Sequence, residues 1–445
     1  MSAKENSIVG KSLWTVGTYG ASIGIRFASN IVLSRVLGPE VMGIVVIAQA
    51  IRTGCDLLTD LGLEQNVVHS PDGNDERFLN TIWTMQIIRG LIVSLFCVAL
   101  APLLARFYRV EAVLLVVVSL APMLNSLMST SIFSVSKRMD VRTRNLFELL
   151  AESIGLAINV ALALTLRNVW ASILGIVLTL AVRSALTYFL HHPPHRFLLD
   201  KVHAPAIFHF SKWIMLSSLA FYAAVYVDRL FLGRVVPLAV LGVYGLAKSI
   251  SDLPNAVAGR LAFQIVFPFV ANRENDLSAG SPARAELARA RRNFLLLVLV
   301  GIATIMAWSD RAVLILYGPK FAAGGWMLCF LLVGGWIAVL SSLNEATVFG
   351  RGEPHNVGFA NVTRFLVMAA ALPVGFAMFG LHGVFLAMPA SELTRYGILM
   401  RAQQRLNLTF RRQDMVLSLW LAAIFAGWLA LRMALGLGLP WAMMG

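Results

Sequence analysis

The sequence has few charged residues and few cysteines. Of its 445 residues, only 13% are charged, whereas 58% are apolar. Average soluble proteins are about 25% charged, so this composition excludes a soluble globular protein and a disordered chain. The three cysteines, Cys55, Cys97 and Cys329, lie in apolar surroundings without metal-ligand spacing. This excludes a disulfide scaffold and predicts that all three are buried packing residues.

Motifs for nucleotide binding or catalysis are also missing. We find no P-loop, no GxGxxG after a strand, no HExxH and no long polar region that would hold a nucleotide. We therefore expect no cofactor, no metal, no nucleic-acid partner and no enzyme activity. The first apolar stretch lacks a short h-region with a cleavage site, which predicts a retained helix rather than a signal peptide.

What the sequence does contain is a series of apolar runs of about 20 residues. Such runs predict a polytopic all-α membrane protein, and the ~10-residue alternating segments of a β-barrel do not occur. The polar breaks divide the chain into thirteen predicted spans: 12–36, 41–63, 79–104, 112–134, 145–166, 169–190, 208–235, 240–268, 293–316, 322–349, 357–379, 382–400 and 415–435.

The distribution of basic residues predicts the orientation. The net charge is +14. With the N-terminus in the cytoplasm, 20 Lys and Arg residues fall in cytoplasmic loops and 8 on the opposite side. This bias follows the positive-inside rule. We therefore expect a multi-pass protein of the cytoplasmic (inner) membrane with its N-terminus inside.

An internal repeat predicts two halves. Residues 11–51 align without a gap on 210–250, with 10 identical positions of 41, among them Arg35/Arg234 and Gly43/Gly242. Six predicted helices separate the copies, so both enter the membrane from the same side, as in a parallel repeat of two six-helix lobes. The predicted parts are an N-terminal lobe, a cytoplasmic linker, a C-terminal lobe and an additional C-terminal helix: 1–190, 191–209, 210–405 and 406–445.

Two polar connections carry open alternatives. The linker 191–209 holds five of the eight histidines and a Pro-Pro pair, which is compatible with a metal or pH-sensing role, although an interfacial linker is favoured because no ligand spacing is present. The basic segment 271–292 is interpreted either as a helix lying on the membrane surface near anionic headgroups or as a solvated face.

Nine basic residues fall inside predicted spans. Each costs about 2.5–3.5 kcal/mol at a helix centre, so most must pair, snorkel or line water. Spacing of three or four residues predicts ion pairs on single helices. The basic residues are Arg26, Arg52, Arg89, Arg183, Arg229, Lys248, Arg260, Arg364 and Arg395, and the predicted pairs are Arg52 with Asp56 (and Asp60 one turn on), Lys248 with Asp252, Arg144 with Glu148 and Glu152, and Glu392 with Arg395.

Several of these arginines have no partner on their own helix. Arg183 is near enough to a helix end to snorkel. Arginine suits phosphate because its planar fork donates two hydrogen bonds and stays charged, so a cationic cavity is one hypothesis. The alternative is pairing between helices, with Asp228, Glu148 or Glu345. The predicted substrate-binding set is Arg26, Arg52, Arg89, Lys248, Arg260 and Arg364; the candidates for proton or Na⁺ coupling are Asp56, Asp228, Asp252 and Glu345.

Six short motifs follow one another along the chain. They are Leu33-Ser34-Arg35-Val36-Leu37-Gly38-Pro39-Glu40 with Gly43, Asp60-Leu61-Gly62-Leu63, Tyr226-Val227-Asp228-Arg229-Leu230-Phe231-Leu232-Gly233, Leu241-Gly242 with Tyr244, Pro254 and Phe267-Pro268, Tyr317-Gly318-Pro319-Lys320-Phe321, and Gly350-Arg351-Gly352. Together they resemble the polysaccharide transporter family, which comprises the lipid-linked oligosaccharide flippases of the multidrug/oligosaccharidyl-lipid/polysaccharide exporter superfamily. The similarity covers most of residues 10–355 and thins toward the C-terminus.

The resemblance implies a V-shaped pair of lobes that open alternately to cytoplasm and periplasm. It also implies an undecaprenyl-pyrophosphate-linked sugar unit as cargo. Related lipid II flippases line the cavity with arginines from helices 1, 2 and 8, and Arg26, Arg52 and Arg260 fall on those helices here. The chain departs from the family pattern in having a thirteenth helix without a fourteenth.

The function predicted from these observations is a flippase for exopolysaccharide, capsule or O-antigen synthesis. Its expected partners are the lipid-linked oligosaccharide, membrane lipid, and a polymerase with export machinery. The first alternative is an ion-coupled multidrug exporter of the same superfamily, although its cationic drugs would favour a cavity rich in carboxylates. The second is a membrane glycosyltransferase or polymerase, although every predicted periplasmic connection is short.

Overall fold

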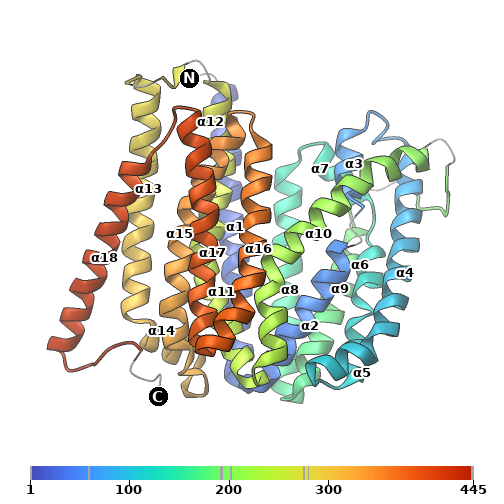
Figure 1. The fold of residues 1–445 in the computed structure, drawn as a ribbon. Coiled ribbons are helices and arrows are strands. Elements are labelled where there is room, and N and C mark those ends of the chain that lie inside the picture. The colour runs from blue at the N-terminus through green and yellow to red at the C-terminus, as the bar shows by residue number, and fades with distance from the viewer. Residues whose placement is uncertain are drawn as a thin grey trace. The chain divides into compact units, whose positions relative to one another are not determined.

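The computed structural model describes residues 3–58, 61–190, 194–200, 203–273, 276–278 and 280–441. These residues form helices, turns and loops, and no strand occurs among them. The chain divides into two compact units, Met1–Gly242 and Val243–Gly445, and Figure 1 shows that both are built of helices.

In its described residues the first unit contains ten helices and the beginning of an eleventh. Four of the ten, α3 and α5 to α7, have only six or seven residues, and residues from α2, α5 and α9 share one apolar core. The helices are α1 (Ala3–Val36), α2 (Pro39–Leu58), α3 (Leu63–His69), α4 (Glu76–Tyr108), α5 (Ala112–Val118), α6 (Ala121–Ser126), α7 (Ser131–Lys137), α8 (Val141–Leu166), α9 (Val169–Thr187) and α10 (His203–Val235).

The second unit is arranged around one buried helix, α15 (Gly324–Gly350). In its most apolar 18-residue window 78% of the residues are buried, against 11% for α16 (Pro354–Phe379) and α18 (Arg411–Ala434). The other helices of this part of the chain are α11 (Leu238–Leu261), α12 (Phe267–Asn272), α13 (Pro282–Ala307), α14 (Ser309–Tyr317) and α17 (Leu381–Arg405), with a π-helical segment, Ala262–Val266, joining α11 to α12.

Local sequence explains where several helices begin and end. The carboxylates of Asp75 and Asp140 accept hydrogen bonds from backbone N–H groups of the first turns of α4 and α8, at 2.6 Å and 3.1 Å, and Asn168 caps α9 in the same way. Such caps satisfy amides that the helix itself leaves unpaired. Gly62 and Gly380 adopt left-handed φ angles of 57° and 58° at the breaks before α3 and α17, a conformation that favours glycine.

Each of the thirteen predicted spans coincides with a helix or a chain of helices. Eight of them, within the described residues, are long and apolar enough to cross a membrane, and the bent α5–α7 segment would make a ninth. The helices α1, α2, α10 and α17 have at least 20 residues and carry several of the ionisable residues discussed above. The count of thirteen spans stays a prediction.

Two predicted segments differ in detail from the structure. The span expected at 112–134 is broken, with a bend of 55° between Ala112–Ser126 and Ser131–Lys137; at the break, the backbone N–H of Ser129 donates to the Thr187 hydroxyl at 2.8 Å. The basic segment 271–292 is not a separate surface helix, because its second half forms the first turns of α13.

The linker after α9 is attached to α4. Backbone N–H groups of Arg196 and Leu198 donate to the side chains of Asn80 and Thr84 at 2.9 Å and 3.0 Å. The Nε2 atom of His195 lies 2.8 Å from the Ser129 hydroxyl, and the His195 ring stacks on the indole of Trp83. No metal-binding group of three or more His, Cys, Asp or Glu side chains is found in the described part of the chain.

Two glycines let α2 and the first turn of α11 touch. A Cβ on Gly43 would lie 2.0 Å from the carbonyl oxygen of Leu238, and a Cβ on Gly242 would lie 2.0 Å from that of Pro39. Gly43 and Gly242 are equivalent positions in the internal repeat. Small residues allow such close backbone approach between membrane helices.

The contacts group α10 with the first unit, where it packs on α2, α3 and α4. The repeat instead makes α10 the first helix of the second lobe. Compactness and sequence repetition are different criteria, so the lobes 1–190 and 210–405, the linker 191–209 and the additional helix 406–445 stay predictions.

Candidate functional site

All nine basic residues that the sequence places inside spans lie in helices. Most of those that the first unit contributes belong to clusters that join several helices. On α1, Arg26 donates through Nε to the Glu152 carboxylate of α8 at 2.9 Å. Arg183 of α9 donates to Glu148 of the same helix at 2.7 Å and lies 4.0 Å from Glu152. The Arg26 side chain is nevertheless 63% exposed, so its ion pair lies open.

These contacts correct one expected pair and bear out the alternative of pairing between helices. Arg26 has no partner on its own helix, as expected, and its partner Glu152 lies on α8. Arg183 pairs with Glu148, one of the carboxylates that the alternative names. Arg144 does not pair with Glu148 or Glu152, because its guanidinium instead contacts Glu64 of α3 and the Ser136 hydroxyl of α7. For Arg144, a carboxylate on a neighbouring helix thus replaces the carboxylates expected one and two turns away on α8.

The second helix carries a pair that the spacing predicted correctly. Arg52 and Asp56 lie 3.5 Å apart on α2, which confirms the pair. On α4, Arg89 donates to the backbone carbonyl of Asp56 at 2.6 Å, so all three residues belong to one cluster. Asp60, expected one turn further on, lies outside the described residues.

A small polar pocket in the first unit adjoins this cluster. It has a volume of about 210 Å³. The Gln86 amide donates to the backbone carbonyls of Ser126 and Met128 at 2.7 Å and 3.1 Å. The lining combines guanidinium, amide, hydroxyl and carboxylate groups, an arrangement that can bind a hydroxyl-rich ligand. The lining residues are Leu63, Glu64, Gln65, Gln86, Arg89, Asn125, Ser126, Met128 and Phe133.

The second unit repeats the pair seen on α2. Lys248 contacts Asp252 one turn away on α11, which confirms the predicted pair, and the Asp252 side chain is 46% exposed. Arg260 lies in the last turn of the same helix and is half-buried.

A second cluster in this unit is enclosed. Arg364 of α16 lies 2.7 Å from Glu392 of α17, although the sequence gave Arg364 no partner on its own helix. Arg395 contacts Glu345 of α15 and lies 3.6 Å from Glu392, so the predicted Glu392–Arg395 pair is confirmed. Two guanidinium and two carboxylate groups balance, which leaves this cluster without net charge.

The acidic candidates lie in unlike surroundings. Asp56 and Asp252 each share a helix with a basic partner, and Glu345 contacts Arg395. Asp228 of α10 is buried, with 1% exposure, and its carboxylate accepts from the backbone N–H of Arg229 at 2.8 Å. Because the two are adjacent in the helix, the Arg229 guanidinium lies elsewhere, 5.0 Å from the centre of the Tyr226 ring.

Sequence reasoning missed two ion pairs whose arginines are almost completely buried. Arg291 of α13 contacts Asp414 of α18, with both side chains no more than 2% exposed, and the Tyr396 hydroxyl donates to Asp414 at 2.9 Å. Arg432 of α18 lies 2.7 Å from Asp310 of α14 and is fully buried. The sequence placed these residues in loops or at span ends. More than 100 residues separate the members of each pair, so helix spacing could not have shown them.

Comparison with known proteins identifies the family. Residues 32–323 match the family described as "Polysaccharide biosynthesis protein", which is about two thirds of the chain. The chain belongs to this family. One curated relative is named as a transport protein, and two structural neighbours are named as a lipid II flippase and a multidrug resistance transporter.

Two curated relatives illustrate the similarity. The chain is 23% identical over 312 residues to the succinoglycan biosynthesis transport protein ExoT of Rhizobium meliloti, covering 69% of this chain and 62% of that protein. It is also 23% identical over 443 residues to the lipopolysaccharide biosynthesis protein WzxC of Escherichia coli, covering 95% and 85%. The chain therefore spans less than two thirds of the Rhizobium protein.

Solved structures show the same fold. The lipid II flippase MurJ, in an inward closed conformation, matches with a TM-score of 0.75 at 10% identity, covering 93% of this chain and 91% of that one. An inward-facing multidrug resistance transporter of the MATE family matches with a TM-score of 0.65 at 14% identity, covering 87% and 94%. The predicted fold class, an all-α multi-pass membrane protein, is confirmed.

Proposed function

We propose that this protein is a flippase that carries undecaprenyl-pyrophosphate-linked oligosaccharide across the inner membrane by alternating access. The observation that carries the proposal is the family match over residues 32–323. The names of its relatives refer to succinoglycan, lipopolysaccharide and teichuronic acid biosynthesis. The shared fold of the lipid II flippase supports it further. The polymer made is an exopolysaccharide, capsule or O-antigen.

The physical problem is the polar head of the cargo. Unpaired polar groups cost several kcal/mol each in hydrocarbon, so a diphosphate with attached sugars does not cross alone. A hydrated, basic path carries the head while the polyprenyl tail stays in lipid. A shift between two conformational states then releases the cargo on the other side.

The proposed phosphate ligands are the six basic residues named from the sequence. In the first unit, Arg26, Arg52 and Arg89 would contact the diphosphate; in the second, Lys248, Arg260 and Arg364. Ion pairing does not remove this role, because a guanidinium has five N–H donors, and the buried Nε atoms of Arg52 and Arg364 have no hydrogen-bond acceptor in the structure. Of the six, we assign Arg26 the leading role because it is the most open to solvent.

We assign proton or Na⁺ coupling to the four acidic candidates. Asp56, Asp252 and Glu345 each contact a basic residue, so protonation or ion binding at the carboxylate would release a cation for the substrate. Asp228 is the strongest candidate, because it is the most buried of the four, with 1% exposure.

Topology and partners complete the proposal. We propose a cytoplasmic N-terminus, two six-helix lobes at 1–190 and 210–405 joined by the linker 191–209, and a further helix within 406–445. The polymerase and export machinery of the same polymer would act on the released cargo.

The test is complementation of a strain that lacks this protein. Arg26→Ala and Arg260→Ala should each abolish polymer production while the protein remains in the membrane. Arg106→Ala is the matched control, because Arg106 is an exposed arginine in the last turn of α4, and it should leave polymer yield unchanged. Polymer production that survives Arg26→Ala and Arg260→Ala would contradict the proposal.

The same strains separate the flippase from the alternatives. Loss of resistance to cationic drugs, with polymer yield intact, would indicate a multidrug exporter. Sugar transfer by the purified protein would indicate a glycosyltransferase or polymerase. Accumulation of lipid-linked oligosaccharide on the inner leaflet, with neither of these, is the expected result.

A further inference from the structure

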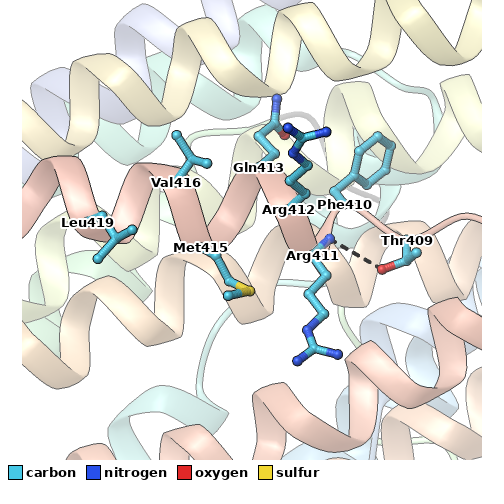
Figure 2. A pocket seen from close by; sticks show the side chains of 8 residues that line it. All are labelled: Thr409, Phe410, Arg411, Arg412, Gln413, Met415, Val416 and Leu419. Atoms are coloured by element: carbon cyan, nitrogen blue, oxygen red, sulfur yellow. Dashed lines mark hydrogen bonds between the residues drawn. The ribbon is translucent and has the colours of Figure 1, made fainter.

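A groove lies at the beginning of α18, in the second unit. Its volume is about 600 Å³. Figure 2 shows Arg411 and Arg412 at the start of α18, with their guanidinium groups on opposite sides of the helix, and apolar side chains along the helix beyond them. The lining residues are Thr409, Phe410, Arg411, Arg412, Gln413, Met415, Val416 and Leu419.

Two of these lining residues supply uncompensated positive charge. Arg411 and Arg412 are both exposed, and neither forms an ion pair with a carboxylate among residues 3–441 as far as these are described. The carboxylate closest in sequence, Asp414, is buried and already contacts Arg291 and the Tyr396 hydroxyl. The groove therefore presents two cations that the described part of the chain does not neutralise.

Apolar side chains follow each arginine on the same face of the helix. Met415 and Leu419 follow Arg411 at intervals of four residues, and Val416 follows Arg412 at the same interval, so each set lies on one face. These three apolar side chains are exposed, with Leu419 at 68%. The nine residues from Arg411 to Leu419 rise by about 12 Å along the helix. The surface thus changes from cationic to apolar over a distance comparable to that from a lipid headgroup to the first part of its acyl chains.

The turn that holds the groove is fixed from behind. The guanidinium of Arg284 on α13 donates to the backbone carbonyls of Asn407 and Thr409 at 2.9 Å and 3.3 Å. Leu408 and Phe410 belong to a buried apolar cluster with residues of α12 and α13. A turn held in this way fixes the backbone from which both arginines extend, which lowers the cost of binding.

We propose that this groove binds one anionic phospholipid of the surrounding membrane. The lipid phosphate contacts Arg411 through charge-assisted hydrogen bonds, and an acyl chain lies along Met415 and Leu419 on the same face. Arg412, on the other side of the helix, adds long-range attraction for the anion. Charge complementarity selects this occupant, because a net-negative headgroup gains from both cations, whereas a zwitterionic headgroup adds an ammonium that they repel. This inference does not depend on what the protein transports.

Native mass spectrometry of the full chain, purified in detergent, tests the proposal by counting bound lipids. Phosphatidylglycerol and phosphatidylcholine with the same acyl chains are added separately. Arg411→Gln/Arg412→Gln should weaken phosphatidylglycerol binding by about tenfold. The control is Arg401→Gln/Arg405→Gln, which removes the same charge from exposed positions near the end of α17, and it should change binding less than about twofold.

A second pair of measurements separates a lipid from a free anion. Leu419→Ser should weaken binding of the long-chain lipid but not of its dihexanoyl form, and inorganic phosphate at the same concentration should not displace the lipid. Equal losses in the two double variants, equal binding of phosphatidylcholine, or displacement by phosphate would each overturn the proposal. Thermal unfolding of every variant shows whether it is folded. If the Arg411→Gln/Arg412→Gln variant does not fold, Leu419→Ser still tests the site.

Discussion

Two ion pairs, one in each unit, differ most clearly in exposure. Arg26–Glu152 joins α1 to α8 with the arginine side chain 63% exposed, whereas Arg291–Asp414 joins α13 to α18 with both side chains 2% exposed or less. Exposed pairs contribute about 0–1 kcal/mol to stability. Removing one member of a buried pair costs about 3–5 kcal/mol, because a charge is left without a partner. The guanidinium of Arg26 is therefore accessible to a ligand, whereas the guanidinium of Arg291 stabilises the fold.

The largest effect should follow from breaking the buried pair. Arg291→Ala should lower the free energy of unfolding by about 3–5 kcal/mol, as measured by unfolding in SDS mixed micelles. It leaves Asp414 buried without its guanidinium, and the amide oxygen of Asn344 also loses its 2.9 Å donor. The double variant Arg291→Met/Asp414→Leu should recover much of this loss, because it leaves no buried charge. If the single variant costs less than about 1 kcal/mol, the pair is not structural.

The next effect concerns packing in the first unit rather than charge. Gly43→Val should lower the free energy of unfolding by about 1–3 kcal/mol, because a side chain there would meet the Leu238 carbonyl. Gly24→Ala is the control, since an added Cβ at that position meets nothing within 4 Å. Equal stability of the two variants would contradict the close approach of α2 and α11.

The exposed pair should separate function from stability. Arg26→Ala should change the free energy of unfolding by less than about 1 kcal/mol yet abolish polymer production. Glu152→Gln, which leaves the arginine in place, should retain polymer production. A loss of stability as large as that of Arg291→Ala would show that Arg26 is a structural residue. It would contradict the distinction between an exposed pair that serves function and a buried pair that serves stability.

The smallest effect is expected at a fully exposed carboxylate. The Thr143 hydroxyl and N–H donate to Asp140 at the start of α8 and lower its pKa below the ordinary value. The stabilisation is present above the pKa of the unfolded state and disappears as the pH falls through the lower folded pKa. Thermal unfolding of Asp140→Asn should therefore differ from the native protein near neutral pH and converge with it in acid. A difference that persists in acid would contradict this cause.

Helix positions followed from the sequence, whereas the pairing of charges followed only in part. Apolar run length is a local property, so all thirteen predicted segments coincide with helices. The same-helix pairs at Arg52 and Lys248 were predicted because four residues make one turn. The partners of Arg26, Arg144 and Arg364 lie on other helices, and their proximity depends on packing that no local pattern encodes. Arg291 was missed because its loop-like sequence surroundings gave no sign of burial.

The contact between Gly43 and Gly242 constrains how this chain can change. Each glycine leaves room for a hydrogen atom only, and one residue inserted before Gly43 would rotate the rest of α2 by about 100° and bring a side chain into the Leu238 carbonyl. If the repeat arose by gene duplication, its two copies have not been free to diverge here. A larger residue at either glycine would clash with the backbone of the other copy.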